Sequence, residues 1–114
     1  MDSLPIINKT YEVYKEIIDI NIHITKRNRH GLGTSLENSI VECIEDLIMA
    51  KNAPKTLKTG YLIRASGKLE VSTLKLRLLL ELSIANETTI FQIQSKMAEI
   101  GRMLGGWLKS LQSS

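Results

Sequence analysis

The sequence of 114 residues has little cysteine, proline, histidine or aromatic content, and these shortages exclude several classes of protein. A single cysteine, Cys43, excludes an intrachain disulfide, and its apolar surroundings in the sequence are typical of a buried thiol. No apolar run is long enough to span a membrane. The start, Met1 to Pro5, lacks the basic and apolar regions of a signal peptide. We therefore expect a soluble, cytoplasmic protein with no membrane contact.

The residues that are present favour one folded, all-α domain. Apolar residues make up 43% of the chain and charged residues 24%, a balance typical of globular proteins and not of disordered ones. Two prolines and short polar breaks separate long stretches in which apolar residues recur every three or four positions. We predict a single domain over 1–114, an antiparallel up-and-down four-helix bundle. Its helices are expected at about 7–25, 35–52, 57–85 and 89–111.

The first predicted helix carries more apolar surface than the core of one bundle needs. One stripe contains Val13, Ile17, Ile20 and Ile24, and a second contains Ile7, Tyr11, Tyr14, Ile18 and Ile22. Together the stripes cover roughly 200° of the helix circumference. Isoleucine and valine also suit strands, but the charged residues recur at three and four positions, which favours a helix.

A basic segment, 26–33, separates the first helix from the second. Its two glycines are expected to turn the chain. Thr34 to Glu37 then matches a capping box, which predicts the start of the second helix. The apolar face of that helix contains Leu36, Ile40, Cys43, Leu47 and Ala50.

The third predicted helix begins just after Pro54 or at about Gly60. Its core face contains Leu62, Ala65, Leu69, Leu76 and Leu80. Gly67 lies inside this helix at a cost of about 1 kcal/mol relative to alanine, which indicates either a close backbone approach or a locally loose helix. Thr89 to Gln92 is a second capping-box match and predicts the start of the fourth helix. The apolar seam of the fourth helix contains Ile90, Ile93, Met97, Ile100, Leu104, Trp107 and Leu111.

The polar residues do not form a converging catalytic or metal-binding set. His23 falls on the polar side of the first helix and His30 in the basic segment, so a Cys–His pair with Cys43 is disfavoured. The acidic residues of the second helix lack the Glu-x-x-His spacing of metal sites in bundles. Gly101 and Gly105 lie within a helical pattern and not between a strand and a helix, so they indicate helix packing and not a phosphate loop. We predict no enzyme activity, no bound metal and no cofactor.

Basic residues suggest an anionic partner. The net charge is +3, from 15 basic and 12 acidic residues, which is a mild bias. Arg64, Lys68 and Lys75 fall within about 40° of one another on a helix, along roughly 16 Å, a span comparable to several phosphate spacings. Lys55 and Lys58 extend this region toward the helix start. The alternative is a solvated helix face on which Lys68 pairs with a nearby acid such as Glu70 through a neighbouring helix, and the sequence leaves both interpretations open. With few aromatics, binding would rest on phosphate contacts.

The C-terminal segment resembles a known family. Residues 99–111 (EIGRMLGGWLKSL) are similar to the closing motif of the accessory variability determinant (Avd) proteins of diversity-generating retroelements. Residues 75–80 (KLRLLL) resemble the leucine-rich third helix of that family. The wider relatives are four-helix proteins encoded in intervening sequences of bacterial large-subunit ribosomal RNA genes.

The resemblance implies a homopentameric barrel of four-helix protomers that supports mutagenic complementary-DNA synthesis without catalysing it. The implied partners are the reverse transcriptase of the element, the template-repeat RNA and DNA. Together with the basic segment, it leads us to expect nucleic-acid contacts at Arg27, Arg29, Lys58, Arg64, Lys68, Lys75 and Arg77. Together with the surplus stripe of the first helix, it leads us to expect packing or subunit contacts at Tyr11, Tyr14, Ile18, Gly101, Arg102, Gly105, Gly106 and Trp107.

One departure from the family pattern weakens the charge argument locally, and a second interpretation of the function stays open. Glu81 stands where the family pattern leads us to expect a basic residue, and it can neutralise Arg77 four positions earlier. The alternative function is a ribosomal intervening-sequence-type bundle, a structural or protein-interaction module unrelated to reverse transcription. A reverse-transcriptase gene and paired template and variable repeats beside the gene would distinguish the two.

Overall fold

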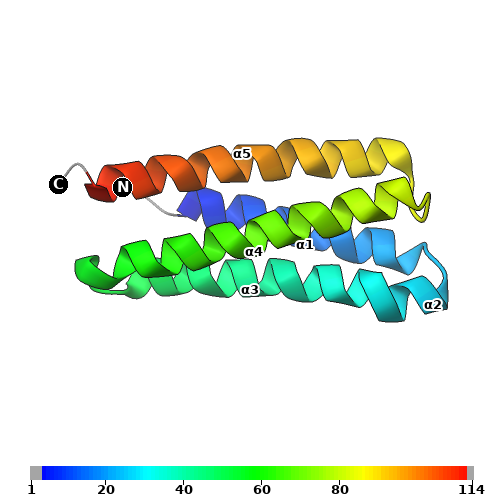
Figure 1. Ribbon diagram of the computed structural model, residues 1–114, viewed down its shortest axis with the longest axis horizontal. Coiled ribbons are helices and arrows are strands. Elements are labelled where there is room, and N and C mark those ends of the chain that lie inside the picture. The colour runs from blue at the N-terminus through cyan, green and yellow to red at the C-terminus, as the bar shows by residue number, and fades with distance from the viewer. Residues whose placement is uncertain (1–3, 113–114) are drawn as a thin grey trace.

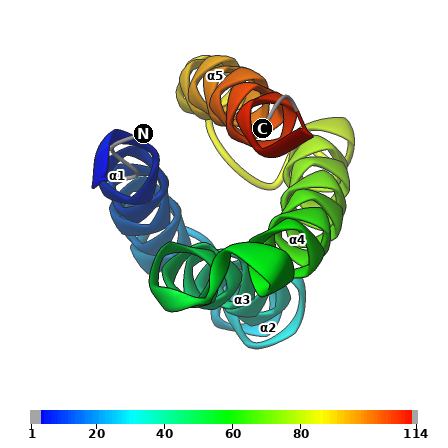
Figure 2. The same cartoon turned by 90° about the vertical axis from the view of Figure 1, so that its left-hand side faces the viewer.

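The computed structural model describes residues 4–112, and all regular structure within that range is helical. The long helices are α1 (Leu4–Ile22), α3 (Thr34–Asn52), α4 (Lys55–Glu81) and α5 (Glu87–Gln112). A short helix α2 (Lys26–Asn28) and one π-helical turn η1 (Arg29–Gly33) connect α1 to α3. The long helices run up and down along an elongated bundle of 47 × 22 × 19 Å (Figure 1). Seen from the end, they follow one another around the bundle in chain order (Figure 2).

The core consists of the apolar faces that the periodicity predicts. On α3 every predicted core residue is fully buried. On α5 the seam from Ile90 to Trp107 is buried, and Leu111 packs against it. On α4 Leu79 is fully buried, whereas the predicted Leu80 is only partly buried. The all-α four-helix prediction is therefore confirmed.

The two apolar stripes of α1 have different environments. The first stripe is buried, including Ile24, which lies beyond the end of the helix at Ile22. In the second stripe Ile7 and Tyr14 pack against the core, while Tyr11 remains 52% exposed and Ile22 61% exposed. The helix begins earlier than predicted because Pro5 lies in its first turn, where a missing N–H breaks no intrahelical bond.

The basic segment 26–33 is helical, and the prediction of a loop turned by glycines is wrong. The chain turns before this segment, and the hydroxyl of Thr25 then accepts a hydrogen bond from the backbone N–H of Asn28 at 3.3 Å. Neither glycine of the segment has a positive φ. Gly33 serves close packing instead, because a Cβ there would lie 2.5 Å from Oδ1 of Asn21 on α1.

The cap geometry of both predicted capping boxes is also wrong, although α3 and α5 begin within two residues of the predicted starts. Thr34 has helical φ and ψ angles, continues directly from η1, and its hydroxyl donates to the carbonyl of Arg29 at 2.6 Å. The start of α5 is capped by Asn86, whose Oδ1 accepts from the backbone N–H of Thr89 at 3.0 Å. A threonine near the start of a helix is therefore not a cap where another polar residue precedes it or where the helix continues backward.

α4 ends at Glu81, four residues before the predicted end. The backbone N–H of Ile84 donates to the carbonyl of Leu79, and that of Ser83 donates to the carbonyl of Leu80, both at 3.0 Å. This pair of bonds is a Schellman motif. Ser83 adopts the left-handed conformation that the motif requires, with φ of 54°, although glycine is the usual residue there.

Candidate functional site

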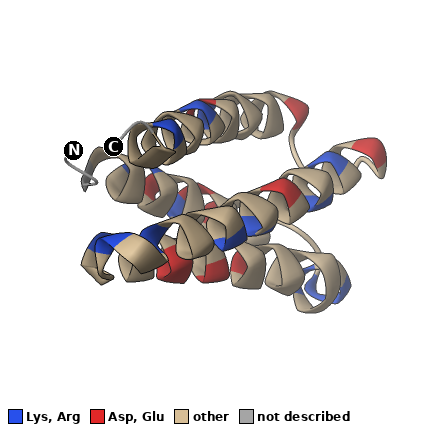
Figure 3. Ribbon diagram, turned by 60° about the vertical axis from the view of Figure 1, so that its left-hand side comes forward, with Lys and Arg blue, Asp and Glu red and all other residues tan. Residues whose placement is uncertain are grey.

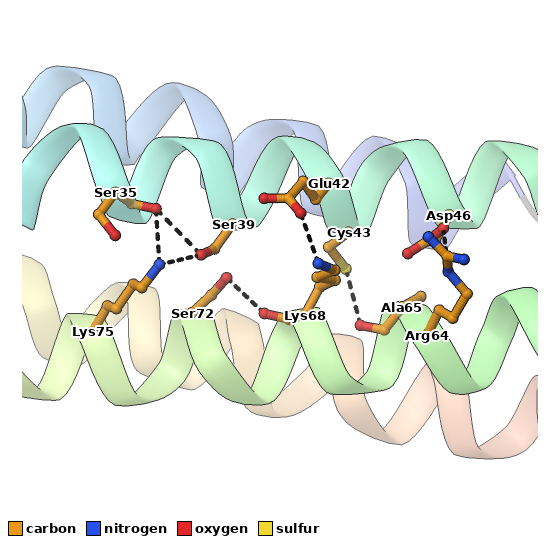
Figure 4. Close-up of polar contacts among 10 residues, drawn as sticks. All are labelled: Ser35, Ser39, Glu42, Cys43, Asp46, Arg64, Ala65, Lys68, Ser72 and Lys75. Carbon is orange, nitrogen blue, oxygen red and sulfur yellow. Dashed lines mark hydrogen bonds and ion pairs between the residues drawn. The ribbon is translucent and has the colours of Figure 1, made fainter.

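The predicted basic stripe of α4 lies along its seam with α3 (Figure 4). Nζ of Lys68 donates to Oε2 of Glu42 at 2.7 Å. Nε of Arg64 lies 3.4 Å from Oδ1 of Asp46, whose carboxylate is almost buried. Nζ of Lys75 donates to Oγ of Ser39 at 2.6 Å and to the carbonyl of Ser35 at 3.2 Å. The three cations are thus brought together on one side of the helix, and each has a partner on α3.

These contacts change the electrostatics of the stripe. The hydrogen bond and charge of Lys68 hold the pKa of Glu42 below its usual value, with a smaller contribution from the charge of Lys75. Basic turns of α4 lie beside acidic turns of α3 (Figure 3), so part of the positive charge is balanced within the protomer. The side chain of Arg64 is still 68% exposed, so its guanidinium can contact an external anion without leaving Asp46.

The other predicted nucleic-acid residues divide into helix caps and exposed cations. Lys58 donates to the carbonyls of Ala50 and Lys51 at the C-terminal end of α3, where a cation complements the helix dipole. Arg29 caps the end of α1 in the same way, and its Nε donates to the carbonyl of Asn21 at 2.7 Å. Arg77 and Arg27 are exposed at the surface.

Arg77 forms the neutralising pair that the sequence indicates. Its Nε lies 4.0 Å from Oε2 of Glu81, and both side chains are 61% exposed. Such a contact is weak because solvent screens it. The guanidinium of Arg77 therefore remains available to an external partner.

Both ends of the bundle carry additional exposed cations that have no side-chain partner within residues 4–112. Lys26 and Arg27 occupy α2 at one end, and Lys51 and Lys55 flank the α3–α4 connection at the other (Figure 1). In contrast to the seam cations, these residues contribute uncompensated positive charge.

Some of the predicted packing and subunit residues pack within their own protomer, and the others are exposed. Trp107 is 5% exposed and belongs to the core of its own protomer. Gly101 makes an ordinary contact, since a Cβ there would lie 3.8 Å from Cδ2 of Leu69. Gly105 and Gly106 are exposed, and a Cβ on either would have no described neighbour within 4 Å, so no described helix of the same chain approaches them. Arg102 is likewise at the surface.

Cys43 is a structural thiol. Burial raises the pKa of this thiol to about 12, with a smaller contribution from the charge of Asp46, and its Sγ–H donates to the carbonyl of Ala65 at 3.4 Å. His23 and His30 are both exposed, and Nδ1 of His23 donates to the carbonyl of Asp19 at 2.8 Å. Among the described residues no three histidine, cysteine or acidic side chains are grouped as metal ligands.

Two ion pairs between α1 and α5 were not predicted. Lys96 donates to Oε1 of Glu16 at 2.5 Å, and Nζ of Lys9 lies 3.0 Å from Oε2 of Glu99. The hydrogen bond from Lys96 to Glu16 raises the pKa of Lys96. Local sequence spacing cannot indicate such pairs, because one member lies on the first long helix and the other on the last.

The fold and these side chains define an all-α four-helix protein whose polar residues join helices and cap helix ends. Among residues 4–112, no helix has the length and apolarity needed to cross a lipid bilayer. Comparison with protein families matches residues 4–111 to the bAvd-like family, and the chain therefore belongs to that family. Proteins of this kind are accessory and non-catalytic. A comparison with curated proteins finds no match.

Proposed function

We propose that this protein is the accessory subunit of a diversity-generating retroelement and binds the reverse transcriptase of the element together with its RNA. The observation that carries the proposal is the bAvd-like match, which spans all four long helices. In this role the chain organises mutagenic complementary-DNA synthesis in the cytoplasm, and the polymerase performs the chemistry. The assembly that we propose for it is a homopentameric ring.

Arg27, Arg64 and Arg77 are the strongest candidates for RNA contacts. All three are exposed, and guanidinium groups suit phosphate recognition. The remaining four predicted cations are engaged in the seam or in helix caps, so they contribute to the field around the molecule more than to direct contacts. For subunit contacts, the exposed part of the second α1 stripe and the open surface at Gly105 are the corresponding candidates.

The first experiment is co-purification of the chain with the reverse transcriptase, followed by copying of template-repeat RNA with and without the chain. We expect a stable complex and mutagenic copying that depends on the chain. A polymerase that neither binds the chain nor changes its products in its presence contradicts the proposal.

RNA contacts are tested by fluorescence anisotropy over a series of salt concentrations. The double variant Arg27→Gln, Arg77→Gln should lower the slope of log affinity against log salt by about 1.4, given about 0.7 per lost phosphate contact. The matched control replaces two other exposed cations, Lys15 and Lys51, with glutamine. Equal losses in both double variants would refute the assignment and indicate a general charge effect.

A further inference from the structure

α4 has a second apolar face, opposite the one that it buries. Its exposed large apolar residues there are Ile63, Val71, Leu74, Leu78 and, directly after the last residue of the helix, Leu82, and they are 40% to 60% exposed. With Gly67 they are separated by steps of four, four, three, four and four residues, which keeps them within roughly 100° of the helix circumference. We call these six residues the outer stripe of α4. It extends for about 30 Å.

Within the described chain nothing covers the middle of this stripe. A Cβ at Gly67 would meet no other atom within 4 Å. The surface is hollowed at this point, in a shallow depression lined by Arg64, Gly67, Lys68 and Val71. Gly67 therefore has no role in packing its own bundle, although it costs helix stability. Contiguous exposed apolar surface of this kind marks a site of protein–protein contact.

The outer stripe has the same pattern in both chain directions. Its positions are symmetric about the point between Ser72 and Thr73, so 63 corresponds to 82, 67 to 78, and 71 to 74. Two antiparallel copies related by a two-fold axis at that point would place Val71 opposite Leu74 and Ile63 opposite Leu82. Leu78 of the second copy would then enter the hollow at Gly67. Steps of four, four and three make an eleven-residue repeat of 3.67 residues per turn, which keeps the stripe on one side of an almost straight helix.

Charges beside the stripe favour the same arrangement. In a two-fold antiparallel pair, each flank of the helix faces the same flank of its partner, and the pair is self-complementary. Glu70 and Arg77 share one flank, so Glu70 faces Arg77 of the second copy, and the contact occurs twice. Glu70 has no side-chain partner among residues 4–112, and Arg77 has only its weak contact with Glu81. On the other flank Lys68 and Lys75 are already bonded to α3, which moderates their mutual repulsion.

We propose that the outer stripe of α4 binds the outer stripe of a second copy of this chain in an antiparallel, two-fold pair. A ring of five subunits requires a different, head-to-tail contact between two unlike surfaces. The two-fold pair is therefore additional to such a ring and does not depend on the proposed function. It joins single chains into dimers, or complete rings into pairs.

The test measures the assembly of the full chain by sedimentation equilibrium. We expect an even number of subunits for the unmodified chain, and half that number for Leu74→Glu. The dissociation constant of the pair should rise by at least about 100-fold, because each pair loses two buried leucines. Met49→Glu is the matched control, since Met49 is 48% exposed on α3 and outside the stripe. Unchanged assembly in Leu74→Glu would overturn the proposal.

A charge exchange tests the predicted register. Glu70→Arg and Arg77→Glu should each weaken pairing by about tenfold, because each creates two like-charge contacts. An equimolar mixture of the two single variants should recover the pairing, since every contact then joins arginine to glutamate again. Both positions are exposed, so circular dichroism should show the same helicity in all variants. A mixture that associates no better than either single variant refutes the antiparallel register.

Discussion

Gly33 should tolerate no larger residue, because it lies against a buried side chain of α1. A Cβ at residue 33 would be 2.5 Å from Oδ1 and 2.9 Å from Cγ of Asn21. Asn21 is 2% exposed and cannot move aside into solvent. Its Nδ2 donates to the carbonyl of Gly33 at 2.9 Å and to Oε2 of Glu37 at 2.5 Å. Gly33→Ala therefore has to displace an amide that joins α1 to the start of α3.

The expected loss follows from these two hydrogen bonds. One has a neutral acceptor and the other a charged one, so breaking both costs roughly 2–4 kcal/mol. Alanine in place of glycine returns up to about 1 kcal/mol of helix propensity. The net prediction for Gly33→Ala is a loss of about 1–3 kcal/mol in the free energy of unfolding.

Urea unfolding followed by circular dichroism measures this loss, and the same π-helical turn supplies the control. Gly31 has no described atom within 4 Å of a Cβ, so Gly31→Ala should be neutral or stabilising. In an Asn21→Ala background, Gly33→Ala should cost nothing further, because the clash is gone. If Gly33→Ala is as stable as Gly31→Ala in the unmodified background, the assigned role of Asn21 is wrong.

Three further predictions concern the seam, the end of α4 and the thiol. Because Lys68 lowers the pKa of Glu42, the pair stabilises the fold above the ordinary glutamate pKa of 4.5 and loses this effect as pH falls below it. Glu42→Gln should therefore lower the urea midpoint more at pH 7 than at pH 3, and equal shifts at both pH values would contradict this. Ser83→Gly should stabilise the protein by about 0.5–1 kcal/mol in thermal unfolding, since φ is 54°, whereas Ser66→Gly inside α4 should destabilise it. Cys43, with its pKa raised to about 12, should react with a disulfide reagent at pH 8 only after unfolding, and rapid labelling of the native chain would contradict its burial.

The sequence predicted the helices better than their ends. Core faces follow from the 3.6-residue period, which depends on burial along the whole helix, so single residues hardly affect it. Ends depend on individual hydrogen bonds. Thr34 matched a cap but continues a π-helical turn, because Asn21, twelve residues before Gly33, forms the contact that holds that turn in place. No pattern within a few residues of Thr34 contains this information.

Only part of the candidate site could be predicted from the sequence, and the reason is similar. Helical spacing correctly placed Arg64, Lys68 and Lys75 on one side of α4. It did not show which helix that side would face, and the partners Glu42 and Asp46 belong to α3. Of the alternative, the pairing of Lys68 with an acid is found, but the acid is Glu42 and not Glu70, and Lys75 bonds Ser39 and not an acid. RNA contact at Arg64 remains a prediction, because its side chain extends past the pair into solvent.

The reversal of all three seam charges illustrates how fold and function overlap in α4. Changing Arg64, Lys68 and Lys75 to glutamate would place acids beside Glu42 and Asp46 and should weaken the contact between α3 and α4. Loss of RNA binding in that variant would therefore have two physical causes. Substitution at exposed Arg27 and Arg77 separates them, since neither cation joins two helices. The two apolar faces of α4 must also be substituted separately, because only substitutions on the outer stripe can change association while leaving the core intact.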